Sequence, residues 1–326
     1  MHLILLRLSA LGDILRVIPA WKNLADAFHG ARIQAVVEDR HAFLLEPFPG
    51  IEPVIVRRRS LSNPFKAIAE LSRVGQLIKG ADASLDFHGI LKSALIPYFA
   101  GIPERWGDGH AKEGTGWLQS NGMAFKRQSR YAQALGLSEG FGLKHGIPSL
   151  GRFEPVLKNV HLPCNDAWPV SSVEKRQRIL LVPGTSRAGA HKRWPLDRWI
   201  QLASACKNTA ELRWSLGPAE DAWREWLPQK SGIEALPAMP FWELASVIRT
   251  ADRVIVGDTG LLHLSILLGV QVIALMGPSD PVISGIPPGT GTIARTQVEC
   301  SPCRERRCLR LSCMEQLHLD KVLAAL

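Results

Sequence analysis

Asp13 is the first residue of the chain whose type and position could do chemistry. It follows the single glycine of the turn in LRLSALGDILRVIPAW, where a strand gives way to a helix. A carboxylate there can cap the helix, and it can also act as a general base on a hydroxyl group. Strand ends of open α/β sheets point into the ligand crevice, which favours the catalytic interpretation. A dinucleotide-binding turn has three glycines where this one has a single glycine, so NAD binding is disfavoured.

A second candidate site is the polar loop in LLVPGTSRAGAHKRWP. A strand enters this loop, and Lys192 and Arg193 follow just before Pro195 starts a helix. Loop amides and hydroxyl groups followed by a cation suit a phosphate group, although the loop lacks the GxxxxGK[ST] pattern. A solvated polar loop accounts for the same residues equally well.

The third candidate site lies in RVIVGDTGLLHLS. Asp258, Thr259 and Gly260 mark the passage from strand to helix, and His263 lies in the first turn of that helix. Free N–H groups at a helix N-terminus attract an anion. Taken alone, the segment is explained more simply as an ordinary N-cap followed by a buried histidine.

Four cysteines near the C-terminus have the spacing C-x2-C-x4-C-x4-C. Such spacing is compatible with tetrahedral thiolate coordination of structural zinc or iron, and four free reduced thiols are the alternative. Cys164 and Cys206 stand alone and are interpreted as ordinary residues. The candidate ligands are Cys300, Cys303, Cys308 and Cys313.

The elements that position these residues alternate between strand and helix. LILLRL, IQAVVE, PVIVR and ASLDF are strand-like, with helix-like stretches at about 11–28, 64–80 and 91–100. The pattern weakens between 145 and 176 and restarts with RILLVP, ELRWSLG, RVIVGD and QVIALMG. The sequence therefore predicts an α/β chain with two doubly wound, Rossmann-like domains facing each other across a cleft, at 1–160 and 161–326. The final helix is a candidate to pack back on the N-terminal domain.

Composition agrees with two domains and an anionic partner. The chain has 326 residues, 46% of them hydrophobic, which is enough for two cores. Its net charge of +9 favours phosphorylated lipid, nucleotide or nucleic acid as partner without choosing among them. No apolar run is long enough to span a bilayer, and the N-terminal residues MHLILLRLSALGD are expected to form a first strand and not a secretion signal. A cytoplasmic protein is expected, with peripheral contact at the cytoplasmic face of the inner membrane as an option.

Taken together, the motifs resemble the ADP-heptose:lipopolysaccharide heptosyltransferase family, and the inner-core heptosyltransferase I group most closely. The matching segments are LGDILRVIPA, VVED, SLDFHGILKSA, GTSRAGAHKRWP, LPAMPFWELASVI, and GDTGLLHLS with GPSDP. The resemblance implies a GT-B fold and inverting transfer of L-glycero-D-manno-heptose from ADP-heptose to the Kdo/inner-core region of lipopolysaccharide. The acceptor would then be a lipid-linked acidic sugar, and catalysis would need no cofactor.

The resemblance also assigns roles to residues. Asp13 would be the catalytic base, and Lys192 would stabilise the departing diphosphate, although extra residues at Ala188–Ala190 leave the register before Lys192 open. Basic side chains of the N-terminal half are candidates for acceptor binding, or else form a solvated face. The donor contacts would be Thr185, Ser186, Lys192, Glu220, Met239, Asp258, Thr259, Gly260 and His263, and the acceptor candidates are Arg57, Arg58, Arg59, Lys92, Arg127 and Arg130.

Other functions remain open at this point. A protein O-heptosyltransferase of the same fold would differ only in its acceptor, and a nucleotide-sugar epimerase would need none. A zinc-ribbon-like nucleic-acid-binding protein would use the cysteines with Arg304, Arg306, Arg307 and Arg310. The chain has no recognised nucleic-acid module and its bases are spread over both halves, so no nucleic-acid partner is expected.

Overall fold

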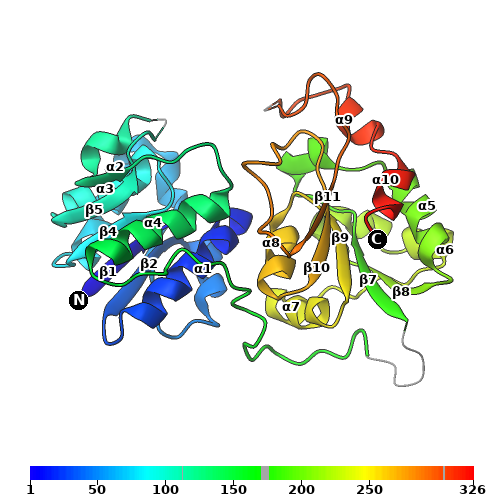
Figure 1. Cartoon of the computed structure of the whole chain (residues 1–326), viewed down its shortest axis with the longest axis horizontal. Helices are drawn as coiled ribbons and strands as arrows, with labels where there is room; N and C mark the ends of the chain where they lie inside the picture. The colour runs from blue at the N-terminus through cyan, green and yellow to red at the C-terminus, as the bar shows by residue number, and fades with distance from the viewer. Residues whose placement is uncertain (112, 170–175, 304) are drawn as a thin grey trace. The chain divides into compact units, whose positions relative to one another are not determined.

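The computed structural model describes residues 1–111, 113–169, 176–303 and 305–326. They form two compact units, Met1–Glu154 and Pro155–Leu326, each built on a parallel sheet with helices around it (Figure 1). The division falls earlier than the expected one after residue 160. The reason is local, because the buried Leu157 donates its backbone N–H to the carbonyl oxygen of Leu267 and thereby belongs to the second unit.

The first unit holds a six-stranded parallel sheet in the order β3-β2-β1-β4-β5-β6. Its inner strands are nearly continuous apolar runs, as expected when helices cover both faces of a sheet. The chain moves outward from β1 in both directions, so the topological switch point lies between the carboxyl ends of β1 and β4. The strands are β1 (His2–Leu6), β2 (Arg32–Glu38), β3 (Glu52–Val56), β4 (Ala83–Asp86), β5 (Glu104–Asp108) and β6 (Asn121–Met123).

Two helix pairs cover this sheet. Helices α2 (Pro64–Leu77) and α3 (Leu91–Phe99) pack against each other, and their buried side chains share a core with Ile4 and Leu6 of β1. Alternate residues of a strand point to opposite faces, so Leu3 and Leu5 point away from α2 and α3. Helices α1 (Leu11–Ala27) and α4 (Arg130–Lys144) form the second pair. Short 3₁₀ turns are η1 (Asp39–Leu45), η2 (Arg58–Ser62) and η3 (Thr115–Leu118).

The second unit holds a five-stranded parallel sheet in the order β11-β10-β9-β7-β8, and its switch point lies between β7 and β9. Trp199 makes edge-to-face contacts with Trp194 and Trp214 in its core. The strands are β7 (Gln177–Val182), β8 (Ala210–Trp214), β9 (Arg253–Gly257), β10 (Gln271–Leu275) and β11 (Gly291–Ala294). The helical elements are η4 (Arg187–Lys192), α5 (Leu196–Cys206), η5 (Pro218–Trp223), α6 (Trp226–Ser231), α7 (Phe241–Arg249), α8 (Gly260–Leu267), α9 (Ser312–Glu315) and α10 (Leu319–Leu323).

The final helix belongs to the second unit. Helix α10 packs against α5, and Val322 is fully buried in the second core. The indole N–H of Trp194 donates to the carbonyl oxygen of Leu317 just before α10. The apolar side chains of α10 therefore contribute to the core of their own unit, and packing of this helix on the N-terminal domain stays a prediction. In the described part of the chain, no helix has both the length and the apolar character needed to cross a bilayer.

Leu202 of α5 tests the packing of the second core. Its side chain is fully buried, so Leu202→Ala should lower the free energy of unfolding by about 2–5 kcal/mol. Leu143 of α4 is 59% exposed, and Leu143→Ala should change it by less than about 0.5 kcal/mol. Urea unfolding of both variants measures the difference, and equal losses would contradict the core described here.

Candidate active site

Asp13 lies in the first turn of α1, at the carboxyl end of β1. Its carboxylate forms ion pairs with Arg7 at 2.9 Å and Arg16 at 3.2 Å. The capping interaction is weaker, because the N–H of Ala10 donates to Asp13 Oδ2 at 3.4 Å. The side chain is 35% exposed, so solvent or a ligand can reach it. The position thus serves as a cap only in part, and two guanidinium groups hold its carboxylate.

These cations set the protonation state of Asp13. Burial raises the pKa of Asp13, but the charges of Arg7 and Arg16 and the hydrogen bonds from Ala10 and Arg7 outweigh burial, so the pKa lies below its usual value. Arg7 is itself fixed, since its Nη1 donates to the carbonyl oxygen of Phe87 at 2.8 Å. Asp13 is therefore ionised at neutral pH and can accept a proton only from a group that is becoming acidic.

Two polar residues at the end of β4 lie beside this cluster. Asp86 is fully buried, and burial raises its pKa to about 6 although it accepts hydrogen bonds from the N–H groups of His88 and Gly89 and from the Ser93 hydroxyl. Burial and the charge of Arg7 lower the pKa of His88 to about 3. The Leu8 N–H donates to His88 Nδ1 at 3.3 Å, so the neutral ring carries its proton on Nε2. The adjacency of β1 and β4 brings these groups to Asp13.

The six acceptor candidates all lie in the first unit and all have partly or largely exposed side chains. Arg58 follows β3 and lies 3.9 Å from Glu38 at the end of β2. Lys92 lies in the first turn of α3. Arg130 opens α4, and its charge acts on Arg7. The candidates thus follow the carboxyl ends of neighbouring strands, where an anionic sugar would meet them, and their role stays a prediction. The others, Arg57, Arg59 and Arg127, lie in the same connections.

In the second unit, a buried carboxylate organises the phosphate-loop candidate. Glu220 of η5 accepts hydrogen bonds from the Thr185 N–H at 3.3 Å and from Arg193 Nη2 at 2.6 Å. Arg193 also donates to Thr185 through Nε and Nη2. A Cβ at Gly184 would overlap Glu220 Oε2, so a larger residue there would require the Glu220 carboxylate to shift from its partners. The loop is therefore held in one conformation by an internal ion pair.

A second polar network lies at the end of β9. Lys192 Nζ donates to Asp258 Oδ2 at 2.7 Å, and the Ser279 hydroxyl donates to the same oxygen at 2.5 Å. His263 Nε2 is 4.0 Å from Asp258 Oδ1. Thr259 is the N-cap residue of α8, and its buried hydroxyl has no hydrogen-bond partner among the residues that the structure describes. A hydroxyl without a partner beside free helix amides and a lysine is suited to an oxyanion ligand.

The structure thus joins most of the predicted donor residues into two networks, through Thr185, Lys192, Glu220, Asp258 and His263. Gly260 opens α8 beside them. Ser186 is exposed at the start of η4, and Met239 is half-buried in the segment before α7.

Sequence reasoning missed several residues of these clusters because they act as partners of chosen residues. Arg193 stood in the quoted phosphate loop, and Ser279 stood in the GPSDP motif. In the first unit, Asp86 and His88 stood in the quoted SLDFHGILKSA motif. The missed residues are Arg7, Arg16, Asp86, His88, Arg193 and Ser279.

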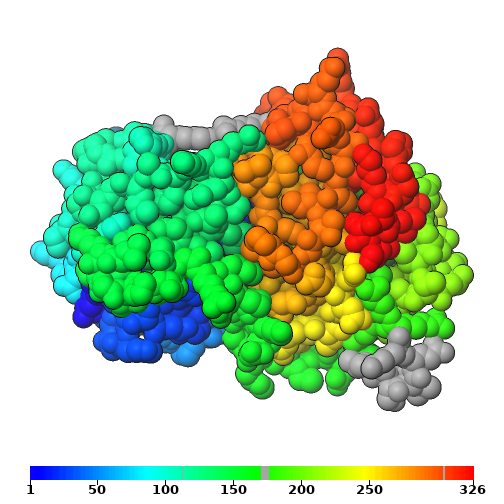
Figure 2. Space-filling view, viewed as in Figure 1, coloured from blue at the N-terminus to red at the C-terminus, as the bar shows by residue number. Residues whose placement is uncertain are grey.

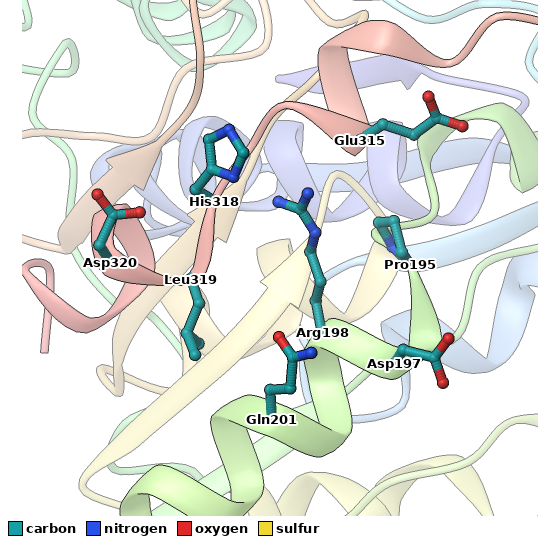
Figure 3. Close-up of a pocket in the computed structure, with 8 residues that line it drawn as sticks. All are labelled: Pro195, Asp197, Arg198, Gln201, Glu315, His318, Leu319 and Asp320. Atoms are coloured by element: carbon teal, nitrogen blue, oxygen red, sulfur yellow. The ribbon is translucent and has the colours of Figure 1, made fainter.

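An open cavity of about 700 Å³ lies elsewhere in the second unit, between α5 and the chain around α9 and α10 (Figure 3). Its lining includes the carboxylates of Asp197, Glu315 and Asp320 around Arg198. None of its lining residues belongs to the predicted donor set. Three carboxylates disfavour a diphosphate, so the two networks above are the better donor site.

Comparison with known proteins gives a match over most of the chain. The family model of glycosyltransferase family 9 (heptosyltransferase) matches residues 71–313. The chain belongs to this family. It is therefore a glycosyltransferase, and this assignment disfavours the nucleic-acid-binding interpretation of Arg304, Arg306, Arg307 and Arg310, of which Arg304 lies outside the described residues.

Individual relatives of this heptosyltransferase-family chain agree. Lipopolysaccharide heptosyltransferase 1 of Pseudomonas aeruginosa is 27% identical, covering 94% of this chain and 87% of the relative. The Escherichia coli K12 protein of the same name is 25% identical, covering 94% and 95%. The structure of the E. coli heptosyltransferase WaaC with ADP-2-deoxy-2-fluoro heptose matches with a TM-score of 0.74 at 22% identity, covering 99% of this chain and 98% of that one. The fold is accordingly GT-B, with two Rossmann-like domains.

The chain that leads into α9 stands out from its unit, orange to red in Figure 2. Of the four C-terminal cysteines, Cys300 is exposed, Cys303 and Cys308 are half-buried, and Cys313 is buried in the second core. Burial raises the pKa of Cys313, and the charges of Cys303, Cys300 and Cys308 raise it further. The described residues contain no group of three or more side chains arranged to hold a metal ion. The four thiols are thus close enough to interact, but in the described residues they are not arranged around a common metal position. A bound metal stays a prediction.

The cysteine prediction can be tested by elemental analysis. If a metal relieves the repulsion among the thiolates, protein purified without added metal should contain about one zinc or iron per chain. The double variant Cys300→Ser, Cys303→Ser should lose it, whereas Cys164→Ser, at an exposed cysteine elsewhere, should keep it. Metal-free wild-type protein would leave only the free-thiol interpretation.

Arg7 and Arg16 generate a pH prediction. Arg7→Met should raise the pKa of Asp13, and Arg16→Gln should raise it less, because the charge of Arg7 lowers this pKa more than that of Arg16 does. Carbon NMR titration measures both shifts, with the Asp13 resonance assigned by its loss in Asp13→Asn. The folded pKa lies below the unfolded one, so ionised Asp13 stabilises the fold above about pH 4 and ceases to do so as the pH falls through the folded value. An unchanged titration in Arg7→Met would contradict this role of Arg7.

Proposed function

We propose that this chain is an inverting heptosyltransferase that moves L-glycero-D-manno-heptose from ADP-heptose to the Kdo/inner-core region of lipopolysaccharide. The observation that carries the proposal is the ionised Asp13 at the switch point of the first sheet, held by Arg7 and Arg16. A partly exposed carboxylate at this place can accept the proton of a sugar hydroxyl. The names of the relatives support the choice of donor and acceptor.

The reaction follows from the two clusters. The acceptor oxygen forms a bond to the anomeric carbon of the heptose. The bond between that carbon and the diphosphate oxygen breaks, and ADP leaves with the bonding electron pair. Asp13 takes the proton late, because two guanidinium groups make its carboxylate a weak base until the attacking hydroxyl has become acidic. Inversion results because attack and departure occur on opposite sides of the carbon.

The donor side of the proposal rests on Lys192 and the start of α8. Lys192 keeps two further N–H donors besides the one that it gives to Asp258, and Thr259 offers an unpartnered hydroxyl. Together with the first amides of α8, these groups would stabilise the negative charge that grows on the departing diphosphate. Asp258 holds the lysine in place for that task. The scheme uses no divalent metal.

The acceptor, the location and the membrane contact belong to the same proposal. A lipid-linked acidic sugar suits the cationic residues that follow β3 and open α3 and α4. Transfer to such an acceptor would take place at the cytoplasmic face of the inner membrane, with the protein in peripheral contact.

The deciding experiment incubates the protein with ADP-heptose and either lipid-linked Kdo sugar or a protein acceptor, and looks for the mass of one added heptose. Mass gained only by protein would favour a protein O-heptosyltransferase instead.

Asp13→Asn tests the mechanism. The change keeps the size of the side chain but removes the base, so turnover should fall by about 10²–10⁴-fold. Loss of the ion pairs with Arg7 and Arg16 should also lower the free energy of unfolding, which urea unfolding measures separately from turnover. Thermal stabilisation by ADP should persist, since the proposed donor contacts lie in the second unit. Asp26→Asn is the matched control, because Asp26 lies in the same helix and pairs only with the exposed Lys22 among the contacts described. Near-normal turnover of Asp13→Asn would show that the residue is only a cap.

A further inference from the structure

The outer side of α2, α3 and η3 carries large apolar side chains in solvent. Phe65 is 82% exposed, Ile68 61% and Trp117 72%. Tyr98 and Phe99 are also exposed. We call these five residues the α2/α3 outer face. A concentration of large exposed apolar side chains on one side of a protein marks an interaction site.

Tyr98, Phe99 and Trp117 are neighbours at the end of α3, and Phe65 and Ile68 lie near the start of the adjacent α2. Helices α2 and α3 lie next to each other, with Gly75 of α2 against the backbone of Ile96 and Ala100 (Figure 1). The opposite side of both helices is buried against β1 and β2. The Tyr98 ring lies 6.0 Å from Phe99 and 6.2 Å from Trp117, which joins η3 to the same face.

Folding does not account for this exposure. The α2 residues that face the sheet already supply a complete apolar stripe, which includes Leu71 and Val74. Asn63 caps α2 by accepting hydrogen bonds from the N–H groups of Phe65 and Lys66, so the Phe65 side chain has no part in starting the helix. The exposed side chains of the α2/α3 outer face are therefore not needed for the stability of the first unit.

The charges around the outer face are mostly positive. Lys66, Lys79 and Lys92 are exposed within residues 64–99, where Asp82 is the one exposed acid. Arg105 lies over the Tyr98 ring at 5.7 Å. Aromatic and aliphatic side chains interspersed with lysines are the composition of surfaces that lie in the headgroup region of anionic bilayers.

We propose that the α2/α3 outer face docks this enzyme onto the surface of a bilayer that contains anionic phospholipids. Phe65, Ile68 and Trp117 enter the boundary between headgroups and acyl chains, and the lysines contact lipid phosphates. A second copy of the chain fits less well, because a two-fold interface would bring two positively charged patches together. The proposal rests on the proposed function in that a lipid-linked acceptor gives the docking its purpose.

The topology links the outer face to the acceptor site. Helix α2 begins soon after β3 and α3 soon after β4, so Phe65 and Lys66 lie toward the sheet edge that also carries Asp13. Docking through this face would hold that edge close to the headgroups, within reach of a sugar carried on lipid.

Vesicle binding tests the face without any sugar substrate. Wild-type protein should sediment with vesicles of phosphatidylethanolamine and phosphatidylglycerol, and less with phosphatidylcholine vesicles. The variants Phe65→Ser with Ile68→Ser, Trp117→Ser, and Lys66→Glu with Lys79→Glu should each weaken binding to the anionic vesicles, the first by about tenfold or more. Leu143→Ser is the matched control, since Leu143 is exposed on α4 of the other helix pair. Melting temperatures identify any variant that fails to fold. The variants that do fold then show whether the α2/α3 outer face binds the vesicles.

Turnover separates docking from chemistry. Transfer to acceptor embedded in vesicles should fall with vesicle binding in the Phe65→Ser, Ile68→Ser variant, whereas transfer to the same sugar without its acyl chains should be unchanged. If no variant or wild-type protein transfers heptose, the proposed function fails while the vesicle result still reports on the face. Absent vesicle binding by wild-type protein, or equal loss in Leu143→Ser, overturns the proposal. A wild-type dimer that Phe65→Ser with Ile68→Ser makes monomeric would identify a second copy as the occupant.

Discussion

The ion pair between Arg7 and Asp13 is the interaction on which the organisation of the first unit depends. Arg7 directly follows β1, and Asp13 lies in the first turn of the next helix, so their pairing closes the β1–α1 connection. The same guanidinium group binds the carbonyl oxygen of Phe87 after β4. It therefore ties together the two strands between which the chain reverses its direction across the sheet. A carboxylate placed there is fixed in position, ionised and within reach of a ligand.

The second unit also fixes its charged side chains through ion pairs, but it uses two separate networks. In each of its two networks a carboxylate forms an ion pair with a cation. Glu220 pairs with Arg193, and Asp258 pairs with Lys192. The cations are held in place by these carboxylates, which would lower the reorganisation needed to bind the diphosphate of the proposed donor. Both carboxylates are buried, so they act through the cations and loops that they hold.

The sequence was sufficient to predict two α/β domains, because parallel strands covered on both faces are continuous apolar runs that alternate with helices. Asp13, Lys192, Asp258 and Thr259 were identifiable from their places at strand-to-helix turns. Arg7, Asp86 and His88 were not, because their importance depends on the adjacency of β1 and β4, which are far apart in the chain. The domain boundary differed because a single buried leucine, Leu157, decides it.

The contact between Gly184 and Glu220 has a consequence for changing the donor. A side chain at position 184 would occupy the space of the Glu220 carboxylate, and loss of that carboxylate would leave Arg193 without its partner and the Thr185 N–H without its acceptor. These residues behave as one module whose parts are not exchangeable singly. Design of an altered nucleotide preference would therefore transplant the loop, the glutamate and the arginine together, or alter residues outside this module.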